Sequence, residues 1–302
     1  MIARNFIINA AHEVGFDLVG VVRVEPLDAE RNRFREWLLQ GRNSTLDYLE
    51  RNVEKRFDMG LLVPGARSVV VCAVSYLSPF SRGYDVDSRT KIASYALARD
   101  YHVTIKDMLR SLAMRLTEYA PELKYRAFTD SAPVAEKSLA VRAGLGWIGR
   151  NSLLVTQELG SMLHLGELVI NEDVDQYDGS REMVGCGECR RCVEACPNGA
   201  IMEDRSIDTN RCISCRTIER EGSGGDITLD GWIFGCDACQ SVCPYNRCVP
   251  LHSNPHFDPL FDPTKFNAEQ WFAMTDEEFA TMAGSTPMPR AGLERIKRNI
   301  GK

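Results

Sequence analysis

Four cysteines lie within eleven residues of this chain, in the run "CGECRRCVEACP" from Cys186 to Pro197. Their spacing is C-x2-C-x2-C-x3-C-P, in which three thiolates bind one [4Fe-4S] cube and the fourth binds a neighbouring cube. Ten of the eleven cysteines of the chain fall between positions 186 and 248. A segment of this kind is held by its ligands rather than by apolar burial. The sequence therefore predicts a small iron–sulfur domain within a larger protein.

A second run, "CDACQSVCP", begins at Cys236 and has one cysteine fewer than the first. Cys212, in the upstream segment "NRCIS", can supply the missing thiolate. Two complete ligand sets result, one for each cube. The first set is Cys186, Cys189, Cys192 and Cys243, and the second is Cys196, Cys212, Cys236 and Cys239.

A pair of structural zinc sites is the alternative interpretation of these cysteines. Zinc sites usually show two separated C-x2-C pairs per ion, rather than a triple with a trailing C-P. The pattern therefore favours iron–sulfur clusters. Cys215 and Cys248 are not needed for eight ligands, and Cys72, inside the apolar run "SVVVCAVSY", is most simply a small core residue.

Outside the cysteine segment, 302 residues with 44% hydrophobic content are enough for a full core. Strands are expected in "FDLVGVVRV", "SVVVCAVSY", "KYRAFT" and "SMLHLGELVI", the second of them buried on both faces. Helical spacing is found before Gly15, in "ERNRFREWLLQG" and in "TIKDMLRSLAMRLTEY". The predicted class is α+β, with a three-layer α/β domain over residues 1–178, a ferredoxin-like domain over 179–250 and an extension over 251–302.

The segment "GLGWIG", from Gly144 to Gly149, has the glycine spacing of a dinucleotide-binding fingerprint. That fingerprint must follow a strand and open a helix. Here the preceding "APVAEKSLAVRAG" looks like a helix, with Asp130 or Ser131 as its N-cap and Gly144 as its C-cap. A loop after a helix is the better interpretation, and the nucleotide site is not expected.

Charge and hydropathy limit where the chain works and what it binds. Its apolar runs are shorter than the roughly 20 residues that span a bilayer, and the N-terminus lacks an export signal, so a cytoplasmic location with no membrane is expected. A net charge of -6 argues against a broadly basic nucleic-acid surface. The C-terminus is either a local basic patch or a solvated helix end. Its basic residues are Arg290, Arg295, Lys297, Arg298 and Lys302, beside the single acid Glu294.

Several longer segments together carry a family resemblance. They are "RFDMGLLVPGARSVV", "YALARDYH", "DSAPVAEKSLAVRAGLGWIGRN", "GSMLHLGEL", "NRCIS" and "FGCDACQSVCP". With the eight-cysteine pattern, the chain resembles the epoxyqueuosine reductases, cobalamin-dependent iron–sulfur enzymes that finish the queuosine base in the tRNA anticodon. Longer members continue into a helical-repeat domain, whereas this chain stops at Lys302, so a form without that domain is expected.

The resemblance implies a cobalamin between the α/β domain and the cluster domain, and it implies a proton donor for the departing oxygen of the epoxide. Asp130, in "TDSAP", matches the family's catalytic aspartate. Burial against the corrin would raise the pKa of Asp130 and keep it protonated. The same likeness places further residues along the cofactor cleft; with Asp130 these are Arg56, Leu154, Leu165, Ser214 and Asp237.

Taken singly, Leu154 and Leu165 could equally be core and Arg56 a surface charge. Tyr95, Tyr101 and His102 are candidates for a substrate mouth, and Trp147 and Asn151 for the border of the cofactor. The implied partners are the anticodon region of tRNA and a low-potential electron donor such as flavodoxin or ferredoxin. Two alternative functions stay open: a corrinoid reductase of a small molecule, similar to a dehalogenase, and a ferredoxin-like electron carrier.

Overall fold

The computed structural model describes residues 1–85, 87–219 and 227–301, and a four-stranded sheet forms the centre of its first half. The strand order is β1-β2-β7-β4, and every neighbouring pair is antiparallel. The strands are β1 (Leu18–Arg23), β2 (Ser68–Ser75), β7 (Leu163–Ile170) and β4 (Tyr125–Phe128). All four strands fall where the sequence predicts them, and the α+β class is confirmed.

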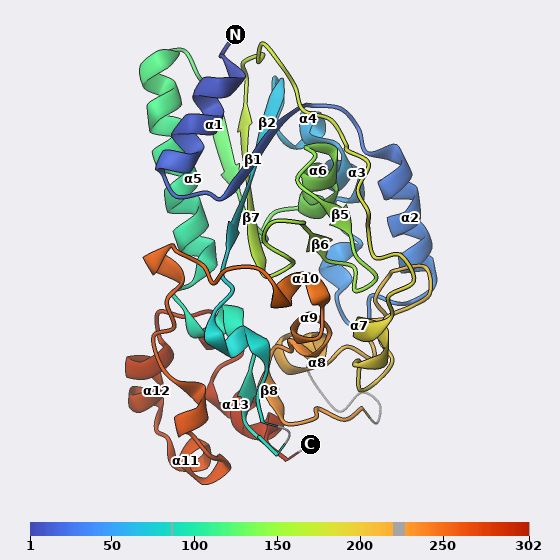
Figure 1. Ribbon diagram of the computed structural model, residues 1–302, viewed down its shortest axis with the longest axis vertical. Helices are drawn as coiled ribbons and strands as arrows, with labels where there is room; N and C mark the ends of the chain where they lie inside the picture. Colours follow the sequence, from blue (N-terminus) through green and yellow to red (C-terminus); the bar gives the residue numbers. More distant parts are fainter. Residues whose placement is uncertain (86, 220–226, 302) are drawn as a thin grey trace.

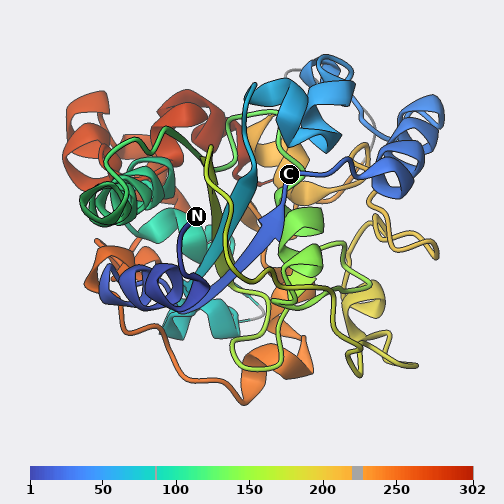
Figure 2. The same ribbon diagram turned by 90° about the horizontal axis from the view of Figure 1, so that it is seen from above.

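Helices cover both faces of this sheet, which gives three layers (Figures 1 and 2). Helices α1 (Arg4–Glu13) and α5 (Tyr101–Tyr119) cover one face. The other face carries α6 (Glu136–Arg142), with α2 (Asp28–Leu39), α3 (Val53–Phe57) and α4 (Met59–Leu62) further out. Strand β2 is buried throughout, because alternate side chains enter the two cores. Val70, Cys72 and Val74 face α1 and α5, and Val69, Val71 and Ala73 face α6.

Helix α5 lies unusually close to β7, and this closeness positions the N-terminal end of the helix. A Cβ at Gly166 would lie 2.5 Å from Cγ2 of Ile105, so only glycine allows this approach. The predicted apolar stripe of α5 is buried from Ile105 to Leu116, while Tyr119 is exposed. The first two residues of α5, Tyr101 and His102, are thereby fixed at one end of the sheet.

Two local predictions were less accurate. The helix expected from about Pro133 begins at Glu136, and its N-cap is Ala135, so the side chains of Asp130 and Ser131 do not cap it. Gly144 follows the helix with φ +72°, as expected of a glycine at a helix end. The "GLGWIG" segment then enters a short hairpin, β5 (Trp147–Ile148) and β6 (Leu154–Val155), which excludes the arrangement of a dinucleotide fingerprint.

The cysteine-rich segment consists of short helices joined by loops, next to one end of the sheet (Figure 1). These helices are α7 (Arg191–Glu194), α8 (Ile213–Ile218), α9 (Ala238–Ser241) and α10 (Pro244–Arg247). None of the eleven cysteines, all of which lie in the described part of the chain, forms a disulfide bond. Few apolar side chains are buried between these helices, as expected of a segment held by metal ligands.

A third region buries its own core and draws on distant parts of the sequence. Strand β3 (Lys91–Ile92) pairs in parallel with β8 (Trp232–Phe234). Ile92 and Leu97 pack with Phe234, Trp271 and residues of the C-terminal helices. These helices are α11 (Ala268–Ala273), α12 (Asp276–Ala283) and α13 (Leu293–Asn299). The 3-10 turns are η1 (Asp47–Leu49), η2 (Pro79–Arg82), η3 (Ser94–Leu97), η4 (Pro255–Phe257), η5 (Pro263–Lys265) and η6 (Met288–Arg290).

Among the described residues, none of the helices combines the length and the apolar character that crossing a membrane requires.

Candidate active site

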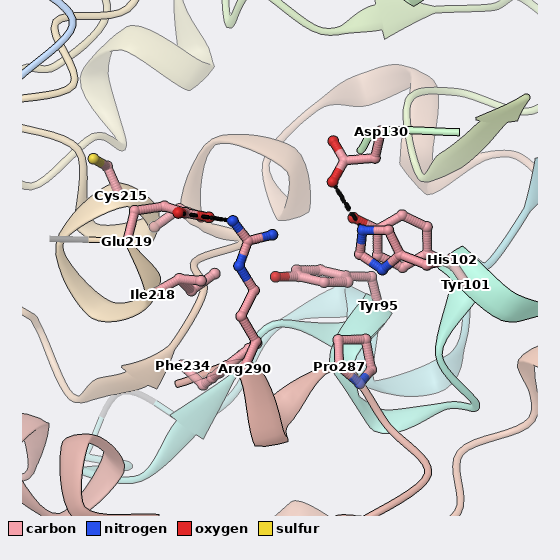
Figure 3. Close-up of a pocket in the computed structure, with 11 residues that line it drawn as sticks. Tyr95, Tyr101, His102, Asp130, Cys215, Ile218, Glu219, Phe234, Pro287 and Arg290 are labelled. Carbon is pink, nitrogen blue, oxygen red and sulfur yellow. Dashed lines mark hydrogen bonds and ion pairs between the residues drawn. The ribbon is translucent and has the colours of Figure 1, made fainter. Parts of the chain in front are cut away.

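A cavity of about 190 Å³ lies where the sheet half, the cysteine segment and the C-terminal region meet (Figure 3). Asp130, Tyr101 and His102 line it from the sheet half, and Tyr95 comes from η3. Ser214, Cys215, Ile218 and Glu219 line it from α8 and the residue that follows, and Phe234, Pro287 and Arg290 complete it. The cavity therefore brings together residues from positions 95 to 290.

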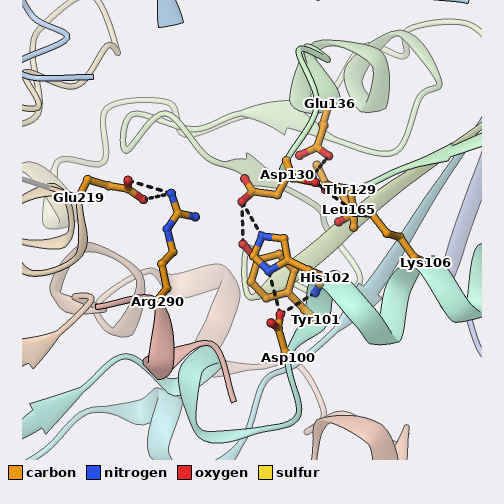
Figure 4. A network of polar contacts seen from close by, with 11 residues as sticks. Asp100, Tyr101, His102, Lys106, Thr129, Asp130, Glu136, Leu165, Glu219 and Arg290 are labelled. Atoms are coloured by element: carbon orange, nitrogen blue, oxygen red, sulfur yellow. Dashed lines mark hydrogen bonds and ion pairs between the residues drawn. The ribbon is translucent and has the colours of Figure 1, made fainter. Parts of the chain in front are cut away.

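Asp130 lies in the loop between β4 and α6 with φ +51°, a left-handed conformation that aspartate tolerates better than most residues. Its Oδ2 accepts hydrogen bonds from the Tyr101 hydroxyl at 2.9 Å and from Nε2 of His102 at 3.0 Å (Figure 4). Nδ1 of His102 bonds Oδ1 of Asp100 at 2.8 Å. The imidazole thus bridges two carboxylates, and only one of them, Asp130, reaches the cavity.

The protonation of this group differs from the sequence-based expectation. Burial alone raises the pKa of Asp130, but hydrogen bonds from His102 and Tyr101 outweigh it and hold the pKa below the ordinary value. Hydrogen bonds to Asp100 and Asp130 raise the pKa of His102 to about 9. At neutral pH the available proton is therefore on His102, and Asp130 is a carboxylate hydrogen-bonded to it.

The backbone of Asp130 is held by a half-buried acid, Glu136. Its N–H donates to Oε1 of Glu136 at 2.5 Å, and Thr129 Oγ1 donates to the Leu165 carbonyl at 2.8 Å. Burial, and then the neighbouring Asp130, raise the pKa of Glu136 to about 7. Glu167, fully buried on β7, has its pKa raised well above the ordinary value by burial and then by Glu136. These contacts fix the loop that carries Asp130.

The Tyr101 ring is held in place by stacking on the ring of His164. The two rings are stacked, with centroids 4.5 Å apart and planes 9° apart. Burial lowers the pKa of His164 to about 3, so this imidazole is neutral. Burial also raises the pKa of Tyr101 above its ordinary value, and Asp130 raises it further. Tyr101 therefore stays a neutral hydroxyl that donates to Asp130.

On the opposite wall, Nη2 of Arg290 lies 2.7 and 2.8 Å from the two carboxylate oxygens of Glu219. The other terminal nitrogen of Arg290 points into the cavity (Figure 3). The two walls interact across the space, because Arg290 lowers the pKa of Asp130 and Asp130 raises that of Arg290.

The structure brings the predicted cysteine sets together. Burial raises the pKa of the Cys192 thiol, and the neighbouring Cys186 and Cys243 raise it further. Burial likewise raises the pKa of the Cys243 thiol, and Cys186 and Cys189 raise it further. In the second set, Cys196 raises the thiol pKa of Cys212, and Cys212 raises that of Cys236. Both Cys212 and Cys196 raise the thiol pKa of Cys239. Cys192 also acts on Cys239, so the two sets are neighbours.

The described residues contain no group of three His, Cys, Asp or Glu side chains spaced to hold a single metal ion.

The residues predicted to contact cobalamin lie in different surroundings. Ser214 and Asp130 line the cavity. Asp237 is 2% exposed, and its Oδ2 accepts from the Ser94 N–H at 2.7 Å, which holds the turn that carries Tyr95. Burial raises the pKa of Asp237 to about 6. The structure therefore places Asp237 behind the cavity wall.

Three other predicted residues lie in the sheet half. The side chains of Leu154 and Leu165 are buried in the core beneath α6. The Arg56 guanidinium lies 5.6 Å from the centre of the Phe34 ring, and its Nε is buried with no hydrogen-bond partner in the described part of the chain. Trp147 packs against Tyr245, with ring centroids 4.9 Å apart. Its Nε1 is also buried with no hydrogen-bond partner among the described residues.

Several residues of the site are absent from the sequence-based assignment. Asp100 lies in the quoted segment "YALARDYH", and its spacing from His102 was an available signal. Glu219 has no neighbouring motif, and Arg290 was assigned to the basic C-terminus instead. In that segment Arg295 donates to the Ile218 carbonyl and Lys297 to the Met274 carbonyl at 2.8 Å, while Arg298 is exposed. Lys302 lies outside the described residues.

An acid–imidazole pair that faces a cavity, with a segment of clustered cysteines beside it, is typical of the class of iron–sulfur oxidoreductases. The family description "Epoxyqueuosine reductase QueG, DUF1730" matches residues 56–131, and "4Fe-4S double cluster binding domain" matches residues 185–246. An epoxyqueuosine reductase of Cyclobacterium marinum is 39% identical over 96% of this chain and 93% of its own length. The chain belongs to the epoxyqueuosine reductase family, and it is an oxidoreductase with iron–sulfur clusters.

Two solved structures give the same result. An epoxyqueuosine reductase in complex with an epoxyqueuosine-modified tRNA-Tyr stem loop has a TM-score of 0.85 and 27% identity, and the match covers 98% of this chain and 79% of that one. The Bacillus subtilis epoxyqueuosine reductase has a TM-score of 0.84 and 27% identity at the same coverage. In that structure an aspartate catalytic loop is swung out of the active site. Membership of this family disfavours the electron-carrier alternative.

Proposed function

We propose that this enzyme reduces epoxyqueuosine in tRNA to queuosine. The reaction consumes two electrons and two protons, converts the epoxide to an alkene and releases its oxygen as water. The observation that carries the proposal is the cavity in which Asp130, bonded to Tyr101 and His102, faces the segment that follows Cys212. Proton donors and the end of an electron pathway meet there.

In this proposal the two cysteine sets hold two [4Fe-4S] clusters with different roles. The first set, from Cys186 to Cys192 with Cys243, is interspersed with exposed residues such as Glu188 and Arg191. The second set includes Cys212, and the cavity residues Ser214 and Cys215 lie two and three positions after it. Electrons therefore enter at the first cluster and leave from the second. A low-potential donor such as flavodoxin or ferredoxin is the expected source.

Cobalamin is the proposed acceptor, and the chain offers unpartnered donors for it. The buried Arg56 Nε and Trp147 Nε1 are available to acceptor groups of a corrinoid, one on the sheet half and one beside the cluster helices. Ser214 and Asp130 line the cavity itself. A cavity of about 190 Å³ suits a small substrate ring rather than a whole corrinoid. When bound, cobalamin supplies a metal centre that collects single electrons for a two-electron reduction.

The protein's own residues supply the protons. Asp130 touches the cavity, and Nε2 of His102 and the Tyr101 hydroxyl both donate to its Oδ2. A proton can pass from His102 through Asp130 to the departing oxygen, while Asp100 stabilises the imidazolium. Asp130 is the proposed general acid, and His102 is the group that stores its proton.

Turnover driven by a chemical reductant is expected to fall as the pH rises through about 9, because His102 then loses its proton. The pKa of His102 in the folded protein lies above its unfolded value, so ionised His102 also stabilises the fold. That contribution is complete below pH of about 6.5 and disappears as the pH rises through about 9. Rates measured from pH 7 to 10 test this, with iron content and circular dichroism as controls. A flat profile in intact protein would contradict the role of His102.

The anticodon region of tRNA is the proposed partner, because a relative with the same fold binds an epoxyqueuosine-modified stem loop. In the described part of the basic C-terminus, Arg298 on α13 is exposed and is a proposed phosphate contact. The proposed division of the chain is a catalytic region over 1–178, a cluster region over 179–250 and an extension over 251–302.

The decisive experiment uses anaerobically reconstituted protein with cobalamin and a chemical reductant. An anticodon stem loop that carries epoxyqueuosine is expected to lose one oxygen per modified base, measured by mass spectrometry. Omission of cobalamin is expected to abolish the change, and a halogenated arene is expected to stay intact. Reduction of the arene without reduction of the stem loop would replace this proposal with a small-molecule reductase.

A further inference from the structure

The wall opposite Asp130 is polar and has no role in the proton transfer described above. It consists of the Arg290–Glu219 pair, beside the apolar residues Ile218, Phe234 and Pro287 (Figure 3). Glu219 is about one-quarter exposed and Arg290 about half exposed. Arg290 comes from turn η6 and Glu219 from the end of α8, so two distant segments converge to build this pair.

The geometry of the pair leaves hydrogen-bonding capacity on the cavity side. Both close contacts to Glu219 involve the same nitrogen, Nη2. The other terminal nitrogen points toward the space in front of Asp130 (Figures 3 and 4). A carboxylate oxygen can accept more than one hydrogen bond, so Glu219 can also receive a donor from a ligand. The wall therefore offers one donor and one acceptor side by side.

Charge decides which kind of ligand this wall suits. Glu219 neutralises Arg290, and a phosphate placed there would meet the carboxylate as well as the guanidinium. A neutral group that both donates and accepts, such as a hydroxyl, satisfies both partners. A buried hydroxyl without partners would be costly, so a substrate that carries one gains specificity from such a wall.

We propose that Glu219 and Arg290 form a substrate-positioning wall that binds hydroxyl groups on the epoxide-bearing ring and turns the epoxide oxygen toward Asp130. This inference rests on the proposed reduction of epoxyqueuosine and adds the residues that orient its ring. No atom of Glu219 or Arg290 takes part in the bond changes. Both are positioning residues, and their loss affects the placement of the substrate rather than the supply of protons or electrons.

The test is Glu219→Gln, compared with wild-type enzyme whose turnover of the epoxyqueuosine stem loop has first been established. The wall predicts a fall in kcat/KM of about 10- to 100-fold, because a charged acceptor is lost. Electrostatics alone predicts no such fall in kcat/KM, since removing a negative charge strengthens the binding of a polyanion. The Kd of the same stem loop without the modified base is therefore expected to be unchanged or lower.

Glu294→Gln on α13 is the matched control, because it removes the same charge from an exposed position outside the cavity. Arg290→Lys is the second variant. It keeps the positive charge but loses the planar guanidinium with its two terminal nitrogens, and a similar fall in kcat/KM is expected. The double variant is expected to lose little more than either single one, since the pair acts as a unit. Equal kcat/KM for wild type and Glu219→Gln would overturn the inference while leaving the reductase activity in place. Inactive wild type would instead overturn the proposed function.

Discussion

Asp130→Asn is expected to lower the turnover of the epoxyqueuosine stem loop by about 100- to 10,000-fold, the usual contribution of a general acid. Asparagine retains an oxygen that can accept from Tyr101 and His102, but it cannot pass a proton to the substrate. Asparagine also tolerates the left-handed backbone at this position, where alanine would add strain of about 1–2 kcal/mol. The substitution therefore isolates the chemistry from the fold.

Single-turnover rates measured under anaerobic conditions check this prediction. Iron content, the absorbance of bound cobalamin and the Kd of the stem loop are expected to match those of the wild type. If Asp130→Asn turned over at a rate within about threefold of the wild type, Asp130 would not be the general acid.

Cys239→Ser is expected to remove one of the two clusters and abolish turnover. Cys239 is predicted to bind the cluster nearer the cavity, so its loss breaks the electron pathway at the last step. The iron content is expected to fall from about eight to about four atoms per chain, as two cubes become one. Elemental analysis and electron paramagnetic resonance of oxygen-free protein measure both outcomes.

Cys248→Ser is the control for this experiment, because Cys248 is exposed and belongs to neither ligand set. Its iron content and activity are expected to be unchanged. Full iron in Cys239→Ser would exclude Cys239 as a ligand, and zinc in place of iron would remove the basis for the proposed electron transfer.

Much of this architecture could be predicted because its signals are local. The spacing of the cysteines identifies an iron–sulfur segment, since a cube requires thiolates at short fixed intervals. Strand β2 was predictable from its valine-rich run, and α5 from its apolar stripe. Asp130 was identified only through the family resemblance, because a lone aspartate before a proline is equally typical of a helix cap.

The rest depends on contacts between distant residues, which local patterns do not contain. The pKa of Asp130 is lowered rather than raised, because hydrogen bonds from His102 and Tyr101 of helix α5 outweigh the effect of desolvation. Glu219 and Arg290 meet although 70 residues separate them, so no motif joins them. Arg290 resembled a solvated end of the chain until the fold placed it in the cavity wall.

The parallel pairing of β3 with β8 has a consequence for how such an enzyme can be taken apart. Ile92, Ala96 and Leu97 belong to the first third of the chain, yet they are buried among side chains from position 218 onward. A fragment that ended near residue 178 would leave these side chains in water, and the complementary fragment would lose the neighbours that close its core. Co-expressed halves are expected to recover activity only if they reassemble this shared core, so the iron–sulfur segment cannot be exchanged between proteins as an independent unit.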